Sequence, residues 1–104
     1  MNKGTVLVID DDPIGLETLA EGLQEEGYEA LPAADGQAGL ALLAERSDID
    51  VVLTDLKMQG VDGMEVLRRA RSADENLPVV LVTAYASVET AIEAMRIGGF
   101  DYVT

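Results

Sequence analysis

The chain has 104 residues and a net charge of −13, from 20 acidic and 7 basic side chains. It contains no cysteine and no histidine, which excludes disulfides, thiolate catalysis and metal sites built on thiolates or imidazole. The negative charge argues against direct binding of nucleic acids or anionic membranes. The length fits one small domain. Because the chain has neither an apolar run long enough to span a bilayer nor a signal peptide at its start, we expect a cytoplasmic protein.

The first half of the chain alternates between short apolar strands and amphipathic helices. A continuous apolar run at 5–9 predicts a strand that is covered on both faces, as in a parallel sheet. A helix should begin at Pro13, which suits a first helical turn, and end near Gly27. A weaker strand at 28–32 and a helix at 36–46 follow. Apolar residues of the first helix recur with helical spacing at Leu16, Leu19, Ala20 and Leu23.

The second half of the chain repeats this alternation. Strands are predicted at 51–54 and 79–82, and the helix between them begins at Asp62, with Glu65 at the spacing of a capping box. A further helix and a weaker last strand are expected at 87–98 and 100–104. The alternation predicts a doubly wound α/β fold with a parallel sheet, and such sheets bind ligands at the carboxyl ends of their strands.

Polar residues at three strand ends carry the candidate chemistry. The first strand runs into Asp10-Asp11-Asp12, the third ends at Asp55, and the fourth is followed by Thr83-Ala84. Carboxylates that meet in one pocket repel each other by about 1–4 kcal/mol per contact, which a bound cation offsets. With oxygen ligands only, we expect Mg²⁺ or Mn²⁺.

An acidic metal pocket with a hydroxyl beside it suits phosphoryl transfer. Asp55 would be the nucleophile that accepts the phosphoryl group, and Thr83 would donate its hydroxyl to a phosphoryl oxygen. Ala84 is small enough to leave the approach open. Taken singly, an aspartate after a strand is more often a helix cap, and we assign that role to Asp12, just before Pro13. The coincidence at three strand ends supports the phosphoryl-transfer hypothesis.

The motifs around these residues resemble the receiver domains of two-component response regulators over the whole chain, and most closely those of the NtrC type. The resemblance rests on the segments 8–12, 53–58, 62–63 and 81–84. It implies a flavodoxin-like, five-stranded parallel sheet of order 2-1-3-4-5. It also implies that a sensor histidine kinase phosphorylates Asp55.

The resemblance also assigns individual roles. Asp11, Asp55 and the backbone carbonyl of Lys57 would ligate Mg²⁺, and Asp10 would act mostly through water. Thr83 and Tyr102 match the switch pair of the family. The surface from 87 to 102 would then report phosphorylation to an output domain, which we expect to control transcription. The chain would be a phosphoacceptor switch and not an enzyme.

Two departures from the family pattern change these expectations. Gln59 stands where the family usually has proline, which should loosen the loop after Asp55 without abolishing its chemistry. The chain ends at Thr104, before the usual lysine and last helix, so we expect a C-terminally truncated receiver domain, 1–104. Such a fragment should be poorly active. It should also leave apolar side chains of strands one, three, four and five open, and therefore associate with itself.

Two other functions remain open from the sequence. The first is a receiver-like protein-interaction module that is not phosphorylated. The second is an aspartate-nucleophile phosphatase of the haloacid dehalogenase kind, in which Asp10 and Asp12 would fit the strand-one motif. Replacement of Asp10 would abolish turnover in such a phosphatase, whereas replacement of Asp55 would abolish phosphorylation of a receiver domain.

Overall fold

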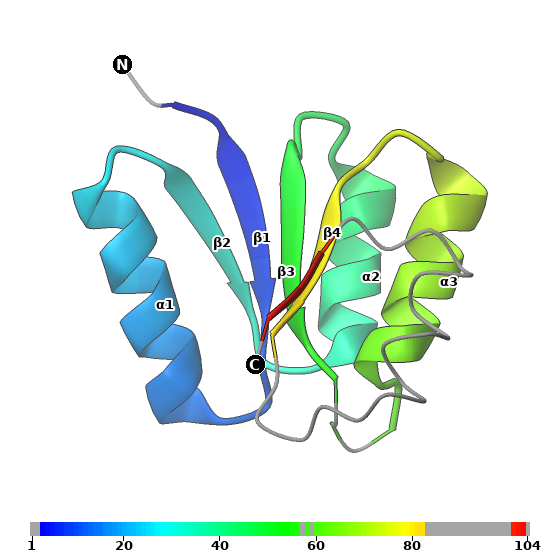
Figure 1. Ribbon diagram of the computed structural model, residues 1–104, viewed down its shortest axis with the longest axis horizontal. Coiled ribbons are helices and arrows are strands. Elements are labelled where there is room, and N and C mark those ends of the chain that lie inside the picture. The colour runs from blue at the N-terminus through cyan, green and yellow to red at the C-terminus, as the bar shows by residue number, and fades with distance from the viewer. Residues whose placement is uncertain (1–2, 57, 59, 83–100, 104) are drawn as a thin grey trace.

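The computed structural model describes residues 3–56, 58, 60–82 and, for the backbone only, 101–103. These residues form a five-stranded parallel sheet and three helices (Figure 1). The strands are β1 (Thr5–Ile9), β2 (Glu29–Ala33), β3 (Val51–Asp55), β4 (Val79–Val82) and β5 (Asp101–Val103). The helices are α1 (Pro13–Glu25), α2 (Gly36–Glu45) and α3 (Gly63–Ala73). The sheet order is β2-β1-β3-β4-β5, so the predicted fold class and order are confirmed.

The predicted ends of α1 are confirmed in atomic detail. Pro13 is the first helical residue, and the Asp12 side chain caps the helix by accepting a hydrogen bond from the backbone N–H of Ile14 at 3.2 Å. At the other end, Gly27 has a φ of 98°, which favours glycine. The N–H of Tyr28 donates to the carbonyl of Leu23 at 3.0 Å, as in a Schellman motif. Local chemistry therefore sets both ends of this helix.

The remaining helices were predicted with small errors at their ends. The side chain of Asp62 caps α3 by accepting from the N–H of Glu65 at 3.0 Å. Helix α2 ends at Glu45, one residue before the predicted end. The predicted helix at 87–98 lies outside the described residues. Within the described part of the chain, no helix is both long and apolar enough to cross a bilayer.

The sheet separates two helical layers. Helix α1 packs on β2 and β1, whereas α2 and α3 pack against each other on the opposite face (Figure 1). The main core lies under α2 and α3. Its fully buried apolar side chains are Leu7, Ile9, Val52, Val66, Leu67, Val79 and Leu81.

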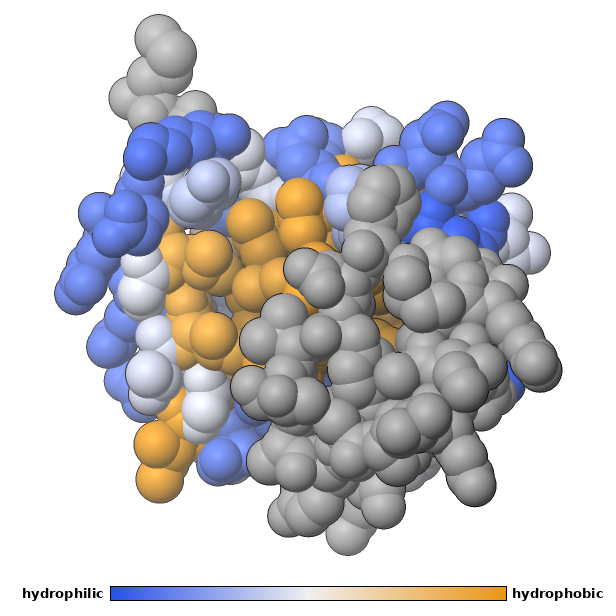
Figure 2. Space-filling view, viewed as in Figure 1, coloured by the Kyte–Doolittle hydropathy of each residue, from blue (hydrophilic) through white to orange (hydrophobic). Residues whose placement is uncertain are grey.

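The face that carries α1 is less completely covered among the described residues. Leu53 of β3 and Val80 and Val82 of β4 are only half-buried, and Figure 2 shows apolar surface beside α1 in the same view as Figure 1. The expectation that strand one would also lie open was wrong, because Val6 and Val8 are 5% and 0% exposed. Strand β1 is central, between β2 and β3 and beneath α1. Self-association stays a prediction.

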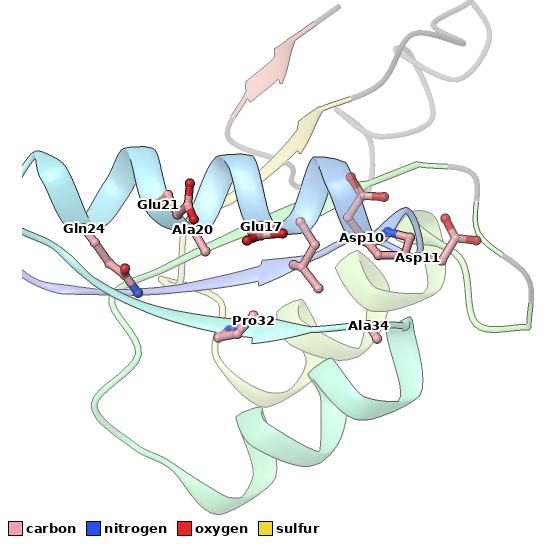
Figure 3. Close-up of a pocket in the computed structure, with 10 residues that line it drawn as sticks. Asp10, Asp11, Glu17, Ala20, Glu21, Gln24, Pro32 and Ala34 are labelled. Carbon is pink, nitrogen blue, oxygen red and sulfur yellow. The ribbon is translucent and has the colours of Figure 1, made fainter.

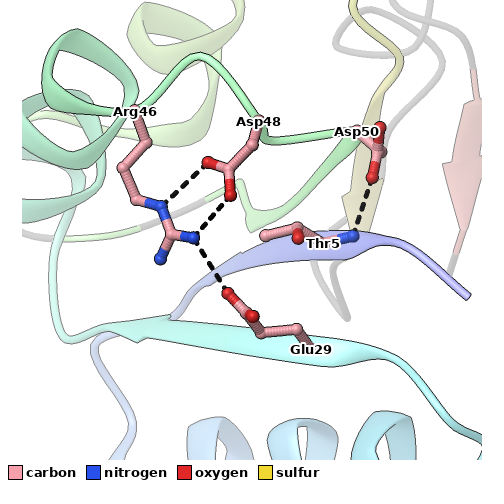
Figure 4. Close-up of polar contacts among 5 residues, drawn as sticks. All are labelled: Thr5, Glu29, Arg46, Asp48 and Asp50. Atoms are coloured by element: carbon pink, nitrogen blue, oxygen red, sulfur yellow. Dashed lines mark hydrogen bonds and ion pairs between the residues drawn. The ribbon is translucent and has the colours of Figure 1, made fainter. Parts of the chain in front are cut away.

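An ion-pair network holds the amino ends of the strands together (Figure 4). Arg46, just after α2, binds Asp48 at 2.6 Å and Glu29 of β2 at 3.0 Å. Its hydrogen bond to Asp48 raises the pKa of Arg46 and holds the pKa of Asp48 below its usual value. The carboxylate of Asp50 accepts the N–H of Thr5 at 2.8 Å. The acidic side chains of Glu29, Asp48 and Asp50 at this edge therefore make structural contacts.

Candidate functional site

The opposite, carboxyl edge of the sheet brings three carboxylates together. Asp10 and Asp11 follow β1, and Asp55 is the last residue of β3. Ile9 lies opposite Thr54 in the parallel register of β1 and β3, which places the next residues of both strands side by side. One carboxylate oxygen from each of Asp10, Asp11 and Asp55 lies within 4.8 Å of the other two.

Backbone hydrogen bonds orient two of these carboxylates. The side chain of Asp10 accepts the N–H of Asp12 at 3.0 Å, and its own N–H continues the β1–β2 ladder by donating to the carbonyl of Ala33 at 3.2 Å. The side chain of Asp55 accepts the N–H of Leu56 at 2.8 Å. Each carboxylate is thus oriented by the loop that begins at its own strand end.

The backbone of Asp55 is fixed by close packing of α3. A side chain at Gly63 would overlap the carbonyl oxygen of Asp55, so only glycine allows the first turn of α3 to lie against the end of β3. The N–H of Gly63 donates to the carbonyl of Leu56 at 2.9 Å, and the buried hydroxyl of Thr54 donates to the carbonyl of Asp55 at 3.0 Å. Movement of α3 would therefore move Asp55 as well.

The donor set of this site fits a hard divalent cation. It offers carboxylate oxygens alone, of which Asp11 is exposed and Asp10 and Asp55 are half-buried. Three acids at this distance repel one another, and a bound cation removes that cost. Mg²⁺ typically takes one or two carboxylates and keeps water or phosphate oxygens as its other ligands. Asp11 and Asp55, with Asp10 beside them, can hold such an ion and leave room for a phosphoryl group.

The other predicted site residues are placed differently. Asp12 caps α1, as expected, and is not part of the acidic cluster found among the described residues, which does not favour a phosphatase that uses Asp10 and Asp12 together. Lys57, Thr83 and Ala84 lie outside the described residues. The backbone of Tyr102 in β5 pairs with that of Leu81 in β4. Tyr102 therefore lies on the strand next to β4, which ends just before Thr83. The roles of these residues stay predictions.

The packing roles of three residues were not recognised from the sequence. Thr54 and Gly63 belong to the segments that carry the resemblance, 53–58 and 62–63, but their contacts with the backbone of Asp55 were not predicted. Gly36, at the start of α2, faces the carbonyl of Val61, which a side chain there would overlap. A glycine directly after a capping aspartate, as in Asp35-Gly36 and Asp62-Gly63, is the signal that could have found two of them.

Comparisons with known proteins agree with this geometry. A family model described as "Response regulator receiver domain" matches residues 6–104. The regulatory protein AtoC of Escherichia coli K12 is 42% identical over 98 residues, which cover 94% of this chain and 21% of AtoC. The chain spans between about a fifth and two-fifths of the length of three curated relatives that it matches.

Solved structures show the same fold. A response regulator receiver domain protein from Clostridium thermocellum superimposes with a TM-score of 0.92 at 35% identity, covering 96% of this chain and 80% of that one. The response regulator TrrA from Thermotoga maritima, solved in complex with Mg(2+)-BeF, superimposes with a TM-score of 0.88 at 33% identity. That alignment covers 100% of this chain and 86% of TrrA.

Proposed function

Because this chain belongs to the response regulator receiver domain family, we propose that it is a phosphoacceptor switch that carries its phosphoryl group on Asp55. The donor is the phosphohistidine of a sensor histidine kinase. In the transfer, a carboxylate oxygen of Asp55 forms a bond to phosphorus as the bond between phosphorus and the imidazole nitrogen breaks, and the imidazole takes up a proton. Bound Mg²⁺ would neutralise the charge of the phosphoryl oxygens.

The observation that carries this proposal is the cluster of Asp10, Asp11 and Asp55 at the carboxyl edge of the sheet. Asp55 belongs to β3, and its backbone is held by Thr54 and Gly63, so its carboxylate is positioned before any donor arrives. Asp11 is exposed, so a cation can reach it from solvent. The complex of TrrA with Mg(2+)-BeF supports the same chemistry, since TrrA shares the fold over the whole of this chain.

A second observation supports a protein as the phosphodonor. Ile14 is 76% exposed in the first turn of α1, and the loop that leads into this turn carries Asp10 and Asp11. A single exposed apolar residue is ordinary on a protein surface, so the contact with a docking protein is inferred from the position of this turn beside the acidic cluster. The kinase would contact this turn while its phosphohistidine approaches Asp55. Phosphorylation would then change the predicted switch surface from 87 to 102, most of which lies outside the described residues, and control an output domain. One relative, AtoC, is named a regulatory protein.

Intact mass spectrometry tests this proposal. The chain is incubated with Mg²⁺ and acetyl phosphate, next to an Asp55→Asn variant as the control. We expect a gain of one phosphoryl group in the unchanged chain, none in the variant, and none when EDTA removes the metal. A matched Asp12→Asn variant should still be labelled, because Asp12 caps a helix and does not belong to the acidic cluster.

Two outcomes would contradict the proposal. Labelling of the Asp55→Asn variant would place the phosphoryl group elsewhere. Absence of labelling, together with an unchanged ¹⁹F spectrum of beryllofluoride in the presence of Mg²⁺ and the chain, would favour an interaction module that is not phosphorylated.

A further inference from the structure

A groove between α1 and β2 shares Asp10 and Asp11 with the acidic cluster, but its other lining residues have no role in the proposed phosphorylation chemistry. This α1–β2 groove has a volume of about 360 Å³ and runs along α1 from the acidic cluster toward the end of the helix (Figure 3). Its apolar surface comes from Pro13, Leu16, Ala20, Pro32 and Ala34, and its polar lining from Asp10, Asp11, Glu17, Glu21 and Gln24. Among the described residues that line it, four are carboxylates and none is basic.

The spacing of the charged residues on α1 destabilises the helix. Glu17, Glu21 and Glu25 follow each other at a spacing of four residues, which stacks like charges on one side of the helix. The last turn contains no basic residue, so Glu25 lies at the end where the helix dipole disfavours negative charge. All three glutamates are exposed. Glu17 and Glu21 of this row line the groove, and we attribute their like charges to recognition of a positive partner.

We propose that the α1–β2 groove is the docking site for a basic amphipathic helix of a protein partner. Apolar side chains of that helix would lie over Leu16, Ala20 and Pro32, and its Lys or Arg side chains would reach Glu17 and Glu21. This arrangement follows the helix-in-groove mode of recognition, in which apolar anchors give affinity and flanking charges give specificity.

A helix fits this groove better than an added strand or an anionic partner. Strand β2 is at the edge of the sheet, but Pro32 lies within it, lacks an N–H to donate and is exposed. Nucleic acids and anionic membranes would be repelled by the four carboxylates of the lining. The proposal does not depend on phosphorylation of Asp55.

The test uses a designed helical peptide of about 18 residues that carries Leu on one face and Lys on its flanks. A peptide with the same composition in scrambled order, which cannot form an amphipathic helix, is the first control. Binding to the intact chain is measured by fluorescence anisotropy, and the contact surface is mapped by amide chemical shifts in NMR. Spermine serves as a probe of charge without apolar contacts.

Paired variants of the protein separate the groove from its charge. In one, Glu17→Gln and Glu21→Gln remove two charges from the groove. In the matched control, Glu25→Gln and Glu26→Gln remove the same number of charges from the last residue of α1 and its C-cap, outside the lining. We expect the groove variant to weaken the amphipathic peptide by about fivefold and the control by less than about twofold. An Ala34→Lys variant should also weaken it, by adding a positive charge to the lining.

The largest shift changes should fall in 16–24 and 30–34, and the scrambled peptide and spermine should bind much more weakly. If both paired variants weakened peptide binding equally, or if the scrambled peptide or spermine bound as tightly as the amphipathic peptide, binding would be nonspecific electrostatic attraction. Either result would overturn the proposal. Shift changes that map to another face, or no binding of the amphipathic peptide at low salt, would also overturn it.

Discussion

Helices α1 and α3 lie on opposite faces of the same sheet and have similar lengths, 13 and 11 residues, but they use their charges differently (Figure 1). In α3, Glu65 stands in the first turn and Arg71 in the last, and Glu65 pairs with Arg69 at 2.9 Å and with Arg68 at 3.6 Å. All charges of α1 are acidic, and they are stacked on one another. The charges of α3 stabilise that helix through ion pairs, whereas the charges of α1 repel one another and are available to a binding partner.

The apolar faces of the two helices differ in the same sense. The face of α3 that includes Val66, Leu67 and Ala70 is 0–2% exposed. On α1 only Ala20 is buried, and Leu16, Leu19 and Leu23 remain half-buried. Helix α3 therefore belongs to the core that fixes Asp55, while α1 retains accessible apolar and acidic surface. Variants of equal chemistry in the two helices should separate these two roles.

The largest difference should come from matched leucine truncations. Leu67→Ala in α3 removes a fully buried side chain and should lower the free energy of unfolding by about 2–5 kcal/mol. Leu19→Ala in α1 removes a half-buried one and should cost about 1 kcal/mol. Urea unfolding followed by circular dichroism measures both. Equal losses would mean that α1 is packed as tightly as α3.

Matched glycine substitutions should have opposite signs. Gly63→Ala at the start of α3 would overlap the carbonyl of Asp55, which we expect to cost about 1–3 kcal/mol and to slow labelling of Asp55 by acetyl phosphate. Gly22→Ala in α1 meets nothing within 4 Å and should stabilise the protein by about 1 kcal/mol, because alanine is the better helix former. If Gly22→Ala also slowed labelling, α1 and the phosphoacceptor would be more tightly coupled than the packing indicates.

A matched charge reversal should also change sign between the helices. Glu21→Lys in α1 replaces two repulsions, with Glu17 and Glu25, by two attractions and should stabilise the protein by about 0.5–1 kcal/mol. Glu65→Lys in α3 breaks the pairs with Arg68 and Arg69 and should destabilise it by about 1 kcal/mol. Because both variants change the net charge equally, opposite shifts in the urea midpoint cannot come from net charge. The same sign for both would refute the contrast between the helices.

Much of the fold and of the candidate site could be predicted from the sequence, because both depend on local patterns. The alternation of apolar runs and amphipathic segments was enough for the fold class, and Asp12 and Asp62 mark the helix starts by a chemistry that acts over two or three residues. The meeting of Asp10, Asp11 and Asp55 was expected from the rule that parallel sheets bind ligands at the carboxyl ends of their strands, together with the strand order implied by the resemblance, which makes strands one and three neighbours.

Contacts between distant elements could not be predicted in this way. The sequence did not reveal that Gly63 lies against the carbonyl of Asp55 or that Arg46 bridges Glu29 and Asp48. It also led to the wrong expectation for β1, because burial of Val6 and Val8 depends on how far α1 covers the centre of the sheet. Such contacts depend on the exact position of each helix on the sheet, which periodicity does not specify.

The smallest predicted effect concerns the ion pair of Arg46 and Asp48, which follows the paired pattern of α3 and not the repulsive pattern of α1. The pKa of Asp48 is lowered in the folded state, chiefly by its hydrogen bond to Arg46. A carboxyl group with a lowered folded pKa binds protons more readily in the unfolded chain, so it stabilises the fold above its unfolded pKa. This contribution is lost as the pH falls through the folded pKa.

Urea midpoints measured from pH 7 down to pH 3 should therefore fall less for an Asp48→Asn variant than for the unchanged chain. A Glu25→Gln variant is the control. It also removes one carboxylate, but helix α1 contains no basic residue with which Glu25 could pair. If the Asp48→Asn variant lost stability with acid as steeply as the unchanged chain, the pair would be a solvent-screened contact without effect on folding.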